Sequence, residues 1–314
     1  MPLDGRIFLA GSRGLVGSAF SRSDALRGAT LLRPSRSELD LEDQGAVQAF
    51  FGAEHPEAVI LAAARVGGIF ANNTYPADFI RSNLAIQCNV IEAAYQHGVQ
   101  RLLFLGSVCA YPKFAPVPIH EDQLLAGALE PTNAPYAVAK IAGIEMCRAY
   151  NRQYGTSYVS VMPTNLYGPG DNFDLQNSHV LPALIRRFHE AKERGDDTVT
   201  LWGTGAPRRE FLHVDDMAAA CLVVMEHHTG NDLVNIGCGE DVSIRELAAT
   251  VREIVGFSGD IAWDASKPDG TPRRVLDVTR MTNYGWTPRI GLEAGIASTY
   301  AWYVNHLDQL RRTG

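Results

Sequence analysis

The sequence predicts an α/β fold with a doubly wound parallel sheet, and two observations support this. Short apolar strands alternate with amphipathic helices through the first half of the chain, and a glycine-rich turn directly follows the first strand. Apolar strands separated by helices are typical of a parallel sheet that is covered on both faces. The glycine-rich turn makes this sheet Rossmann-type, with a smaller C-terminal α/β domain expected after it.

Five strands are expected in the first half, each of them a short run of mostly apolar residues. They span residues 6–10, 30–33, 58–62, 101–106 and 158–162. Helices are expected between them, because apolar residues recur there with the helical period. These helices run from the glycine-rich turn to Leu26, around residues 47–51 and 79–94, and over residues 136–154.

The second half follows a different pattern. Residues 163–178 are rich in Gly, Pro and Asn and are predicted to form a long functional loop, because plain connectors are shorter. Asp215 is expected to cap a helix that runs to Glu226, and Ser243 begins a capping box. Further elements are expected as helices over 179–194 and 292–306 and as strands over 198–202, 211–213 and 233–236.

The change of pattern predicts two domains. Residues 1–165 are expected to bind a dinucleotide, and residues 166–314 are expected to form mainly a substrate domain. A later segment, about residues 211–237, is expected to return to the first domain.

Composition excludes several classes of function. The 314 residues carry a formal net charge of −7, which argues against general nucleic-acid binding. No apolar run is long enough for a membrane span, and no signal peptide is apparent at the N-terminus. Five cysteines without a CxxC pair predict reduced thiols and a cytoplasmic protein. No metal site is expected, because helix capping explains the acidic run at 215–216 better than metal ligation does.

The glycine-rich turn is the first candidate binding site. Its spacing is GxxGxxG, and it lies between the first strand and the first helix. Glycines there permit a tight turn and let backbone N–H groups approach a pyrophosphate at the helix N-terminus. The alternative is a plain strand–helix turn. The residues concerned are Gly11, Ser12, Arg13, Gly14, Leu15, Val16 and Gly17.

The end of the second strand predicts which dinucleotide is bound. An acidic residue there would select NAD, but the segment holds Arg36 and no carboxylate at the strand tip. Arg36, helped by Arg13, is predicted to form a charge-assisted pair with a 2′-phosphate, which favours NADP(H). Asp40 and Leu41 are expected at the adenine edge. The alternative is a pair of solvated surface arginines.

Ser107, Tyr136 and Lys140 form the strongest catalytic signal. Ser107 ends the fourth strand, and the Tyr-x-x-x-Lys spacing places both other side chains on one helix face. A free phenol has a pKa of about 10, so it is a weak acid or base at neutral pH. We expect the Lys140 ammonium to lower the pKa of Tyr136 and the Ser107 hydroxyl to bond a reacting carbonyl.

Other residues suggest further chemistry less specifically. Cys109 follows Ser107 on the same loop and is a candidate base, while His179 begins a helix and is a candidate proton donor. Each could equally be an ordinary structural residue. Cationic residues of the second half would suit a substrate diphosphate, and Trp202 could stack on a base. These cations are Arg186, Arg187, Arg208, Arg209 and Lys267.

Long runs of residues resemble one family over nearly the whole chain. The sequence is similar to the GDP-L-fucose synthases, a family of extended short-chain dehydrogenases/reductases. Small departures are Ser12 and Val108, where His and Ser are expected. The matching runs span residues 64–69, 71–76, 105–112, 130–133, 163–169, 209–216 and 267–273.

The resemblance implies a reaction and a role for each candidate. GDP-4-dehydro-6-deoxy-D-mannose would be inverted at C3 and C5, and its C4 ketone then reduced by NADPH to give GDP-L-fucose. Tyr136 would give the proton in reduction with support from Ser107 and Lys140. Cys109 and His179 would be the epimerisation base and acid.

The resemblance also implies the binding residues. The substrate would contact Arg187, Trp202, Arg209 and Asp269. The cofactor would contact the glycine-rich turn, Arg36, Asp40, Leu41, Leu105, Gly106, Ser107, Val108, Lys140, Pro163, Thr164, Asn165, Leu166 and His179. As in relatives, a homodimer is expected to pair the helices near 80–97 and 136–154.

Three alternatives remain from the sequence. A GDP-L-colitose synthase would use the same residues on a 3,6-dideoxy keto sugar and invert C5 alone. An NAD-retaining sugar-nucleotide epimerase or dehydratase would show no net use of NADPH, and Arg36 argues against it. A non-catalytic NADP sensor would have no need of the Tyr136 phenol.

Overall fold

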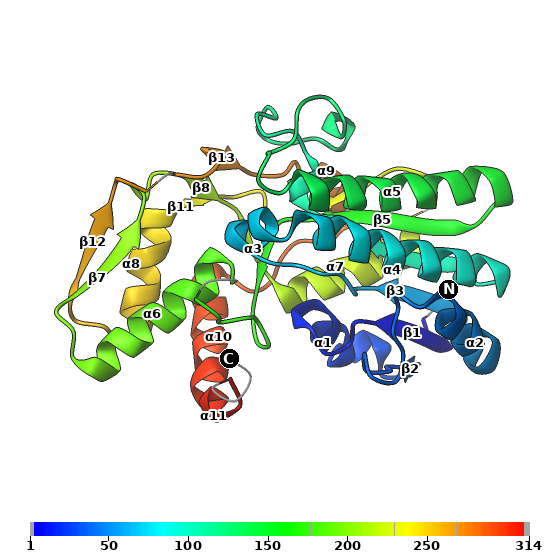
Figure 1. The fold of residues 1–314 in the computed structure, drawn as a ribbon, viewed down its shortest axis with the longest axis horizontal. Helices are drawn as coiled ribbons and strands as arrows, with labels where there is room; N and C mark the ends of the chain where they lie inside the picture. The colour runs from blue at the N-terminus through cyan, green and yellow to red at the C-terminus, as the bar shows by residue number, and fades with distance from the viewer. Residues whose placement is uncertain (1–2, 176–177, 229, 268, 311–314) are drawn as a thin grey trace.

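A six-stranded parallel sheet forms the larger half of the molecule (Figure 1). The computed structural model describes residues 3–175, 178–228, 230–267 and 269–310. The strand order is β10-β5-β4-β3-β1-β2, and every pair in it is parallel, which confirms the predicted fold class. The strands are β1 (Arg6–Ala10), β2 (Thr30–Leu32), β3 (Ala58–Leu61), β4 (Arg101–Leu105), β5 (Ser157–Pro163) and β10 (Val234–Ile236).

Helices cover both faces of this sheet. Phe8 and Ala10 of β1 pack into one apolar core, whereas Ile7 and Leu9 pack into another on the opposite face. Both sets of alternating positions are therefore buried, so the strand reads as a continuous apolar run. The first core holds α2 (Gln44–Glu54), α4 (Pro76–Gln96) and α5 (Ala134–Tyr154), and the second holds α1 (Leu15–Ser21) and α7 (Val214–His227).

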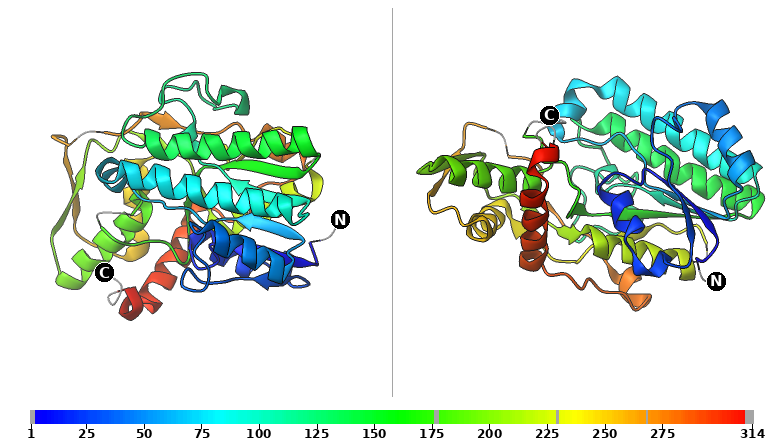
Figure 2. Two further views of the ribbon diagram at one scale, coloured as in Figure 1. Left: turned by 45° about the vertical axis from the view of Figure 1, so that its right-hand side comes forward. Right: turned by 90° about the horizontal axis from the view of Figure 1, so that it is seen from below.

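The smaller half has its own core and lies at one end of the sheet (Figures 1 and 2). Three helices meet there through Phe188, Val251 and Ile296. They are α6 (Val180–Arg194), α8 (Ile244–Val255) and α10 (Leu292–Asn305). Parallel strands β7 (Thr198–Trp202) and β12 (Asp260–Asp264) pack beside them. The second sheet has the order β11-β8-β13 and comprises β8 (Arg208–Arg209), β11 (Val242–Ser243) and β13 (Arg273–Arg274).

Three local predictions are wrong. The expected loop 163–178 contains a strand, β6 (Asn165–Tyr167), which pairs with β9 (Phe211–His213); its residues 176 and 177 lie outside the described part. The N-cap of α7 is His213, whose Nδ1 accepts from the Asp215 N–H at 3.3 Å, because Asp215 instead pairs with Arg22. The first helix ends at Ser21, before a 3₁₀ turn, η1 (Asp24–Leu26).

Further short elements complete the described chain. They are α3 (Ile69–Thr74), α9 (Thr279–Asn283), α11 (Leu307–Leu310), and the 3₁₀ turns η2 (Val108–Ala110) and η3 (Glu121–Gln123). The capping box at Ser243 is confirmed. The division into two domains near residue 165 stays a prediction.

Helix α5 lies directly against strand β4 at Gly143. A Cβ atom on Gly143 would lie 2.2 Å from Cζ of the buried Phe104 ring, which is far inside van der Waals contact. Only glycine therefore allows this close approach. The contact sets the distance between the sheet and the helix that carries Tyr136 and Lys140.

Replacing Gly143 with alanine is expected to lower the free energy of unfolding by about 1–3 kcal/mol, because it overpacks a dense core. This loss would occur although alanine favours a helix interior by about 1 kcal/mol over glycine. Urea denaturation measures the change.

The matched control is Gly52→Ala in α2, where the nearest atom to a new Cβ is His97 Cε1 at 3.4 Å. That variant is expected to gain up to about 1 kcal/mol. A Gly143→Ala protein as stable as the Gly52→Ala protein would contradict the tight contact.

Candidate active site

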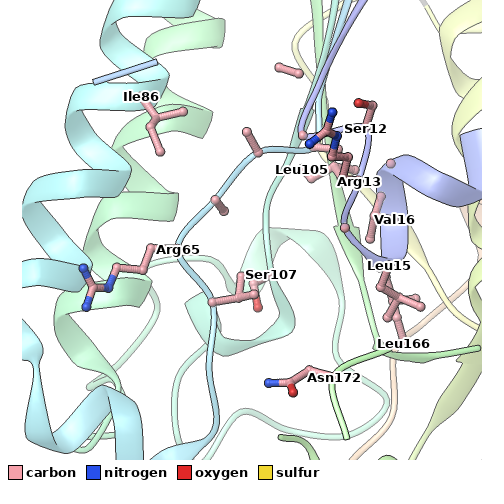
Figure 3. Close-up of a pocket in the computed structure, with 18 of the residues that line it drawn as sticks. Ser12, Arg13, Leu15, Val16, Arg65, Ile86, Leu105, Ser107, Leu166 and Asn172 are labelled. Carbon is pink, nitrogen blue, oxygen red and sulfur yellow. The ribbon is translucent and has the colours of Figure 1, made fainter. Parts of the chain in front are cut away.

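A cavity of about 970 Å³ opens at the carboxyl ends of the parallel strands. Ligands of open α/β sheets bind at this edge. Segments from the ends of β1, β4 and β5 meet there, and Figure 3 shows Ser12, Ser107 and Leu166 around the cavity. Every residue predicted to contact the cofactor lines the cavity, and so do the five predicted catalytic residues.

The glycine-rich turn has the geometry that a dinucleotide requires. Gly11 has φ +87°, and a Cβ atom on it would lie 2.7 Å from the Ala63 backbone nitrogen. A Cβ atom on Gly17 would lie 2.1 Å from the Gly11 carbonyl oxygen. Gly14 is the N-cap of α1 and provides no side-chain cap, so N–H groups at this terminus are open to ligand oxygens. The turn therefore fits a dinucleotide diphosphate.

Two arginines with carboxylate neighbours lie at the end of the cavity where the adenosine of the cofactor is expected. Arg13 and Arg36 line the cavity, and Arg36 Nη2 lies 3.4 Å from Glu42 Oε1. Glu42 also pairs with Arg81 at 2.9 Å. Hydrogen bonds from Ser35, and to a smaller extent the charge of Arg13, lower the pKa of Glu38. Two guanidinium groups at this end fit a 2′-phosphate.

Ser107, Tyr136 and Lys140 come together as predicted from their spacing. Ser107 is close enough to the Tyr136 hydroxyl for hydrogen bonding to oppose the rise in the pKa of the phenol, and Ser107 Oγ accepts from the Cys109 N–H at 3.3 Å. Lys140 Nζ donates to the Leu105 carbonyl oxygen at 2.8 Å and lies 5.8 Å from the centre of the Tyr136 ring. All three side chains therefore meet beside the end of β4.

Burial has the largest effect on the pKa values of Tyr136 and Lys140. Desolvation raises the pKa of Tyr136, the nearby Cys109 adds to this shift, and the Ser107 hydrogen bond opposes it. Burial lowers the pKa of Lys140 to about 8. The expectation that Lys140 makes the phenol more acidic is wrong for this structure, because desolvation outweighs any effect of the ammonium. The phenol therefore remains protonated at neutral pH and can donate its proton.

Cys109 and His179 lie on different elements that line the same cavity. Cys109 is half-buried in η2, directly after Ser107 and Val108. His179 is the N-cap of α6 and is exposed toward the cavity that it lines, while surrounding protein atoms lower its pKa by desolvation. A thiol and a neutral imidazole thus share one cavity with the Tyr136 phenol.

The four predicted substrate residues lie outside the lining of this cavity, in the smaller half. Trp202 is 68% exposed at the end of β7, with Lys267 Nζ 5.7 Å from its ring centre. Asp269 accepts from the Thr204 N–H at 2.9 Å and from its hydroxyl at 2.7 Å. Arg187 lies on α6, and Arg209 on β8.

Arg209 links these residues to the catalytic group. Burial and the neighbouring Arg274 lower its pKa to about 10, and the Cys109 thiol partly opposes this shift. Arg274 Nη1 donates to the Val108 carbonyl oxygen at 2.9 Å, and Arg274 is the register partner of Arg209 in the second sheet. Two guanidinium groups therefore approach the loop that carries Cys109.

Sequence reasoning missed several residues that line or support the cavity. Arg274 is one of them: it is buried beside Arg209 in the second sheet, and neither its burial nor this pairing is visible in the sequence. Asp171, Asn172 and Ser178 come from the long loop after β5, and only its unusual length pointed to them.

Two kinds of feature are absent from the described residues. No three His, Cys, Asp or Glu side chains there gather as a set that could hold a metal ion. None of the helices in this part of the chain combines the length and apolar character that a membrane span needs.

Comparison with known proteins gives the family. Residues 7–237 match the NAD dependent epimerase/dehydratase family. GDP-L-fucose synthase 1 of Arabidopsis thaliana is 58% identical and covers 96% of this chain and 94% of its own. GDP-L-fucose synthase of Escherichia coli strain K12 is 57% identical, with 98% of each chain covered.

Solved structures agree with these relatives. A GDP-L-fucose synthetase from Naegleria fowleri bound to NADP superposes with a TM-score of 0.90 at 28% identity, covering 98% of this chain and 95% of that one. The chain therefore belongs to the NAD dependent epimerase/dehydratase family, and within it to the group that contains the GDP-L-fucose synthases.

Proposed function

We propose that this enzyme converts GDP-4-dehydro-6-deoxy-D-mannose to GDP-L-fucose by 3,5-epimerisation and NADPH-dependent 4-reduction. The observation that carries the proposal is the group of Ser107, Tyr136, Lys140 and Cys109, which come together in the lining of a cavity that fits a dinucleotide. Relatives of 57–58% identity named as GDP-L-fucose synthases support the substrate.

NADP(H) is the cofactor, and it supplies a hydride when bound. The glycine-rich turn would hold its diphosphate, because backbone N–H groups of this turn are open to ligand oxygens. Arg13 and Arg36 would hold its 2′-phosphate through charge-assisted hydrogen bonds. Asn165 lines the same cavity, together with the catalytic residues Lys140 and His179.

Epimerisation requires a base and an acid around an acidified carbon. C3 and C5 of the sugar both lie α to the C4 ketone, so stabilising negative charge on the ketone oxygen acidifies their protons. Ser107 and Tyr136 can donate hydrogen bonds to this oxygen. The active form would be the Cys109 thiolate with the His179 imidazolium, which has the same number of protons as the thiol and the neutral imidazole. Cys109 would take the proton from one face of the sugar, His179 would return a proton to the other face, and exchange with solvent would restore both groups.

Reduction uses the same oxygen. Tyr136 would give its phenolic proton to the C4 oxygen as the alcohol forms, which the raised pKa of the phenol favours because it remains protonated. Lys140 would stabilise the phenolate left behind, and it holds its place through the Leu105 carbonyl. One set of side chains can therefore serve both steps.

The smaller half would bind the GDP portion. Arg187 and Arg209 would contact the diphosphate, Trp202 would stack on the base, and Asp269 would complete the site, as in the family. Asp269 and Trp202 are brought close by Thr204, which donates two hydrogen bonds to Asp269. A homodimer through α4 and α5 stays a prediction.

The direct test is incubation of the protein with NADPH and GDP-4-dehydro-6-deoxy-D-mannose, or the corresponding 3,6-dideoxy keto sugar. We expect NADPH consumption with the first substrate and GDP-L-fucose as the product. Faster turnover of the 3,6-dideoxy sugar would instead indicate a colitose-forming enzyme, and no NADPH consumption with either would overturn the proposal.

Tyr136→Phe removes the proton donor and is expected to lower reduction at least a hundredfold, since positioned acid–base groups contribute about 10²–10⁴-fold. Absorbance of NADPH measures this step, and fluorescence titration should show unchanged cofactor affinity.

Cys109→Ser is the complementary variant. It is expected to slow entry of solvent deuterium at C3 and C5 far more than Tyr136→Phe does, with little effect on GDP binding. If both variants lost exchange and reduction equally, the separate roles of phenol and thiol would be wrong.

Arg36→Ala is expected to shrink the preference for NADPH over NADH by about tenfold or more, because hydrogen bonds to charged groups contribute about 1.5–3 kcal/mol. The ratio of kcat/KM values with the two cofactors measures it. Arg81→Ala, which removes the other partner of Glu42, is the control. An unchanged ratio in the Arg36 variant would show that the 2′-phosphate binds elsewhere.

A further inference from the structure

The loop that follows β6 carries a buried acid that the catalytic steps do not use. Asp171 lies directly after Gly170, which has φ +88°, and its N–H donates to the Gly168 carbonyl oxygen at 3.2 Å. A Cβ atom on Gly170 would lie 3.3 Å from Ser18 Oγ of α1. The loop therefore packs against the helix that the glycine-rich turn begins.

One carboxyl oxygen of Asp171 has no hydrogen-bond partner among the described residues. Its side chain is 6% exposed, and it lines the same cavity as the glycine-rich turn. Oδ1 accepts from the Asn172 N–H at 2.7 Å, whereas Oδ2 is buried and has no hydrogen-bond partner among the described residues. Ser178 Oγ, at the other end of the loop, also lacks a described partner. Oδ2 has almost no accessible surface in this structure, so other atoms of Asp171 line the cavity, and a small rotation of the side chain would bring Oδ2 to a ligand there. An unpartnered buried polar atom beside a cavity points to such a ligand.

The electrostatic surroundings favour the neutral acid. Burial raises the pKa of Asp171 to about 7, and the Asn172 N–H only partly opposes this shift. Arg22, the C-cap of α1, is already paired with Asp215. His213, the N-cap of α7, lies beside Gly168 at the start of this loop, and Asp215 and Asp216 follow it in the first turn of α7. Arg13, Lys140 and His179 line the same cavity as Asp171. None of these charges contributes to the shift of Asp171, so burial is its cause.

We propose that Asp171 is a cofactor-binding residue that, as the neutral acid, donates a hydrogen bond to an oxygen of the dinucleotide bound in the cavity. The ionised carboxylate cannot donate, and it repels the phosphate groups of the ligand. Cofactor binding therefore weakens as pH rises through neutrality. The inference rests on the proposed use of NADP(H) and is independent of the sugar substrate.

Fluorescence titration of NADPH at pH 6 and pH 8 tests this in the wild type, Asp171→Asn and Asp171→Ala. The asparagine amide can donate at both pH values, so the ratio of wild-type Kd to Asp171→Asn Kd is expected to rise about tenfold from pH 6 to pH 8. Taking this ratio cancels the titration of Lys140 and His179, which both proteins share. Asp171→Ala is expected to bind more weakly than the wild type at pH 6.

Asp122→Asn is the control for loss of one carboxylate, because Asp122 is exposed on η3 and does not line the cavity. This variant should show the same change in NADPH affinity between pH 6 and pH 8 as the wild type. A ratio that is the same at both pH values, or an Asp171→Ala protein that binds as tightly as the wild type at pH 6, would overturn the inference.

A second measurement needs no variant at this position. Infrared difference spectra of the wild type should show a protonated carboxyl when NADPH binds at pH 8, and its absence would also overturn the inference. If the protein turns over neither keto sugar but NADPH binding shows the expected pH dependence, the result contradicts the proposed reaction and leaves the role of Asp171 standing.

Discussion

The site depends on the direct contact between helix α5 and strand β4. Because Gly143 has no Cβ, the helix approaches the Phe104 ring closely, and Lys140 lies one turn earlier on the same helix. Lys140 Nζ then reaches the Leu105 carbonyl at 2.8 Å and lies 5.0 Å from the centre of the Phe104 ring. A wider separation would move Tyr136 away from Ser107, so one backbone approach fixes the catalytic geometry.

Burial at this contact also sets the chemistry. A group removed from water favours its neutral form, so the amine of Lys140 loses its proton more readily and the phenol of Tyr136 holds its proton more firmly. The shift of Tyr136 keeps the proton on the phenol until it is donated, and Lys140, with a pKa of about 8, still carries its charge in most molecules at neutral pH. The same low-dielectric setting strengthens the hydrogen bonds that would hold a developing negative charge on a substrate oxygen.

Glu210 joins the two halves of the molecule next to Arg209. Its fully buried carboxylate accepts from the N–H groups of Cys238 at 2.6 Å, Gly239 at 2.7 Å and Leu276 at 2.9 Å. Its own carbonyl oxygen accepts from the side chains of Thr164 and Asn165. The wall of the dinucleotide cavity and the strand that carries Arg209 are therefore held together through one residue.

The sequence by itself determined the parallel sheet, the dinucleotide turn and the Ser107–Tyr136–Lys140 group, because each depends on local periodicity or on spacing within one helix. Only the tertiary structure decided the pairing of β6 with β9, the approach of Arg274 to Val108, and the burial of Asp171. It also reversed the expected pKa shift of Tyr136. Two of these features are contacts between segments that lie far apart in the chain. The other two result from burial by several elements at once. Neither kind of feature can be predicted from local periodicity or spacing.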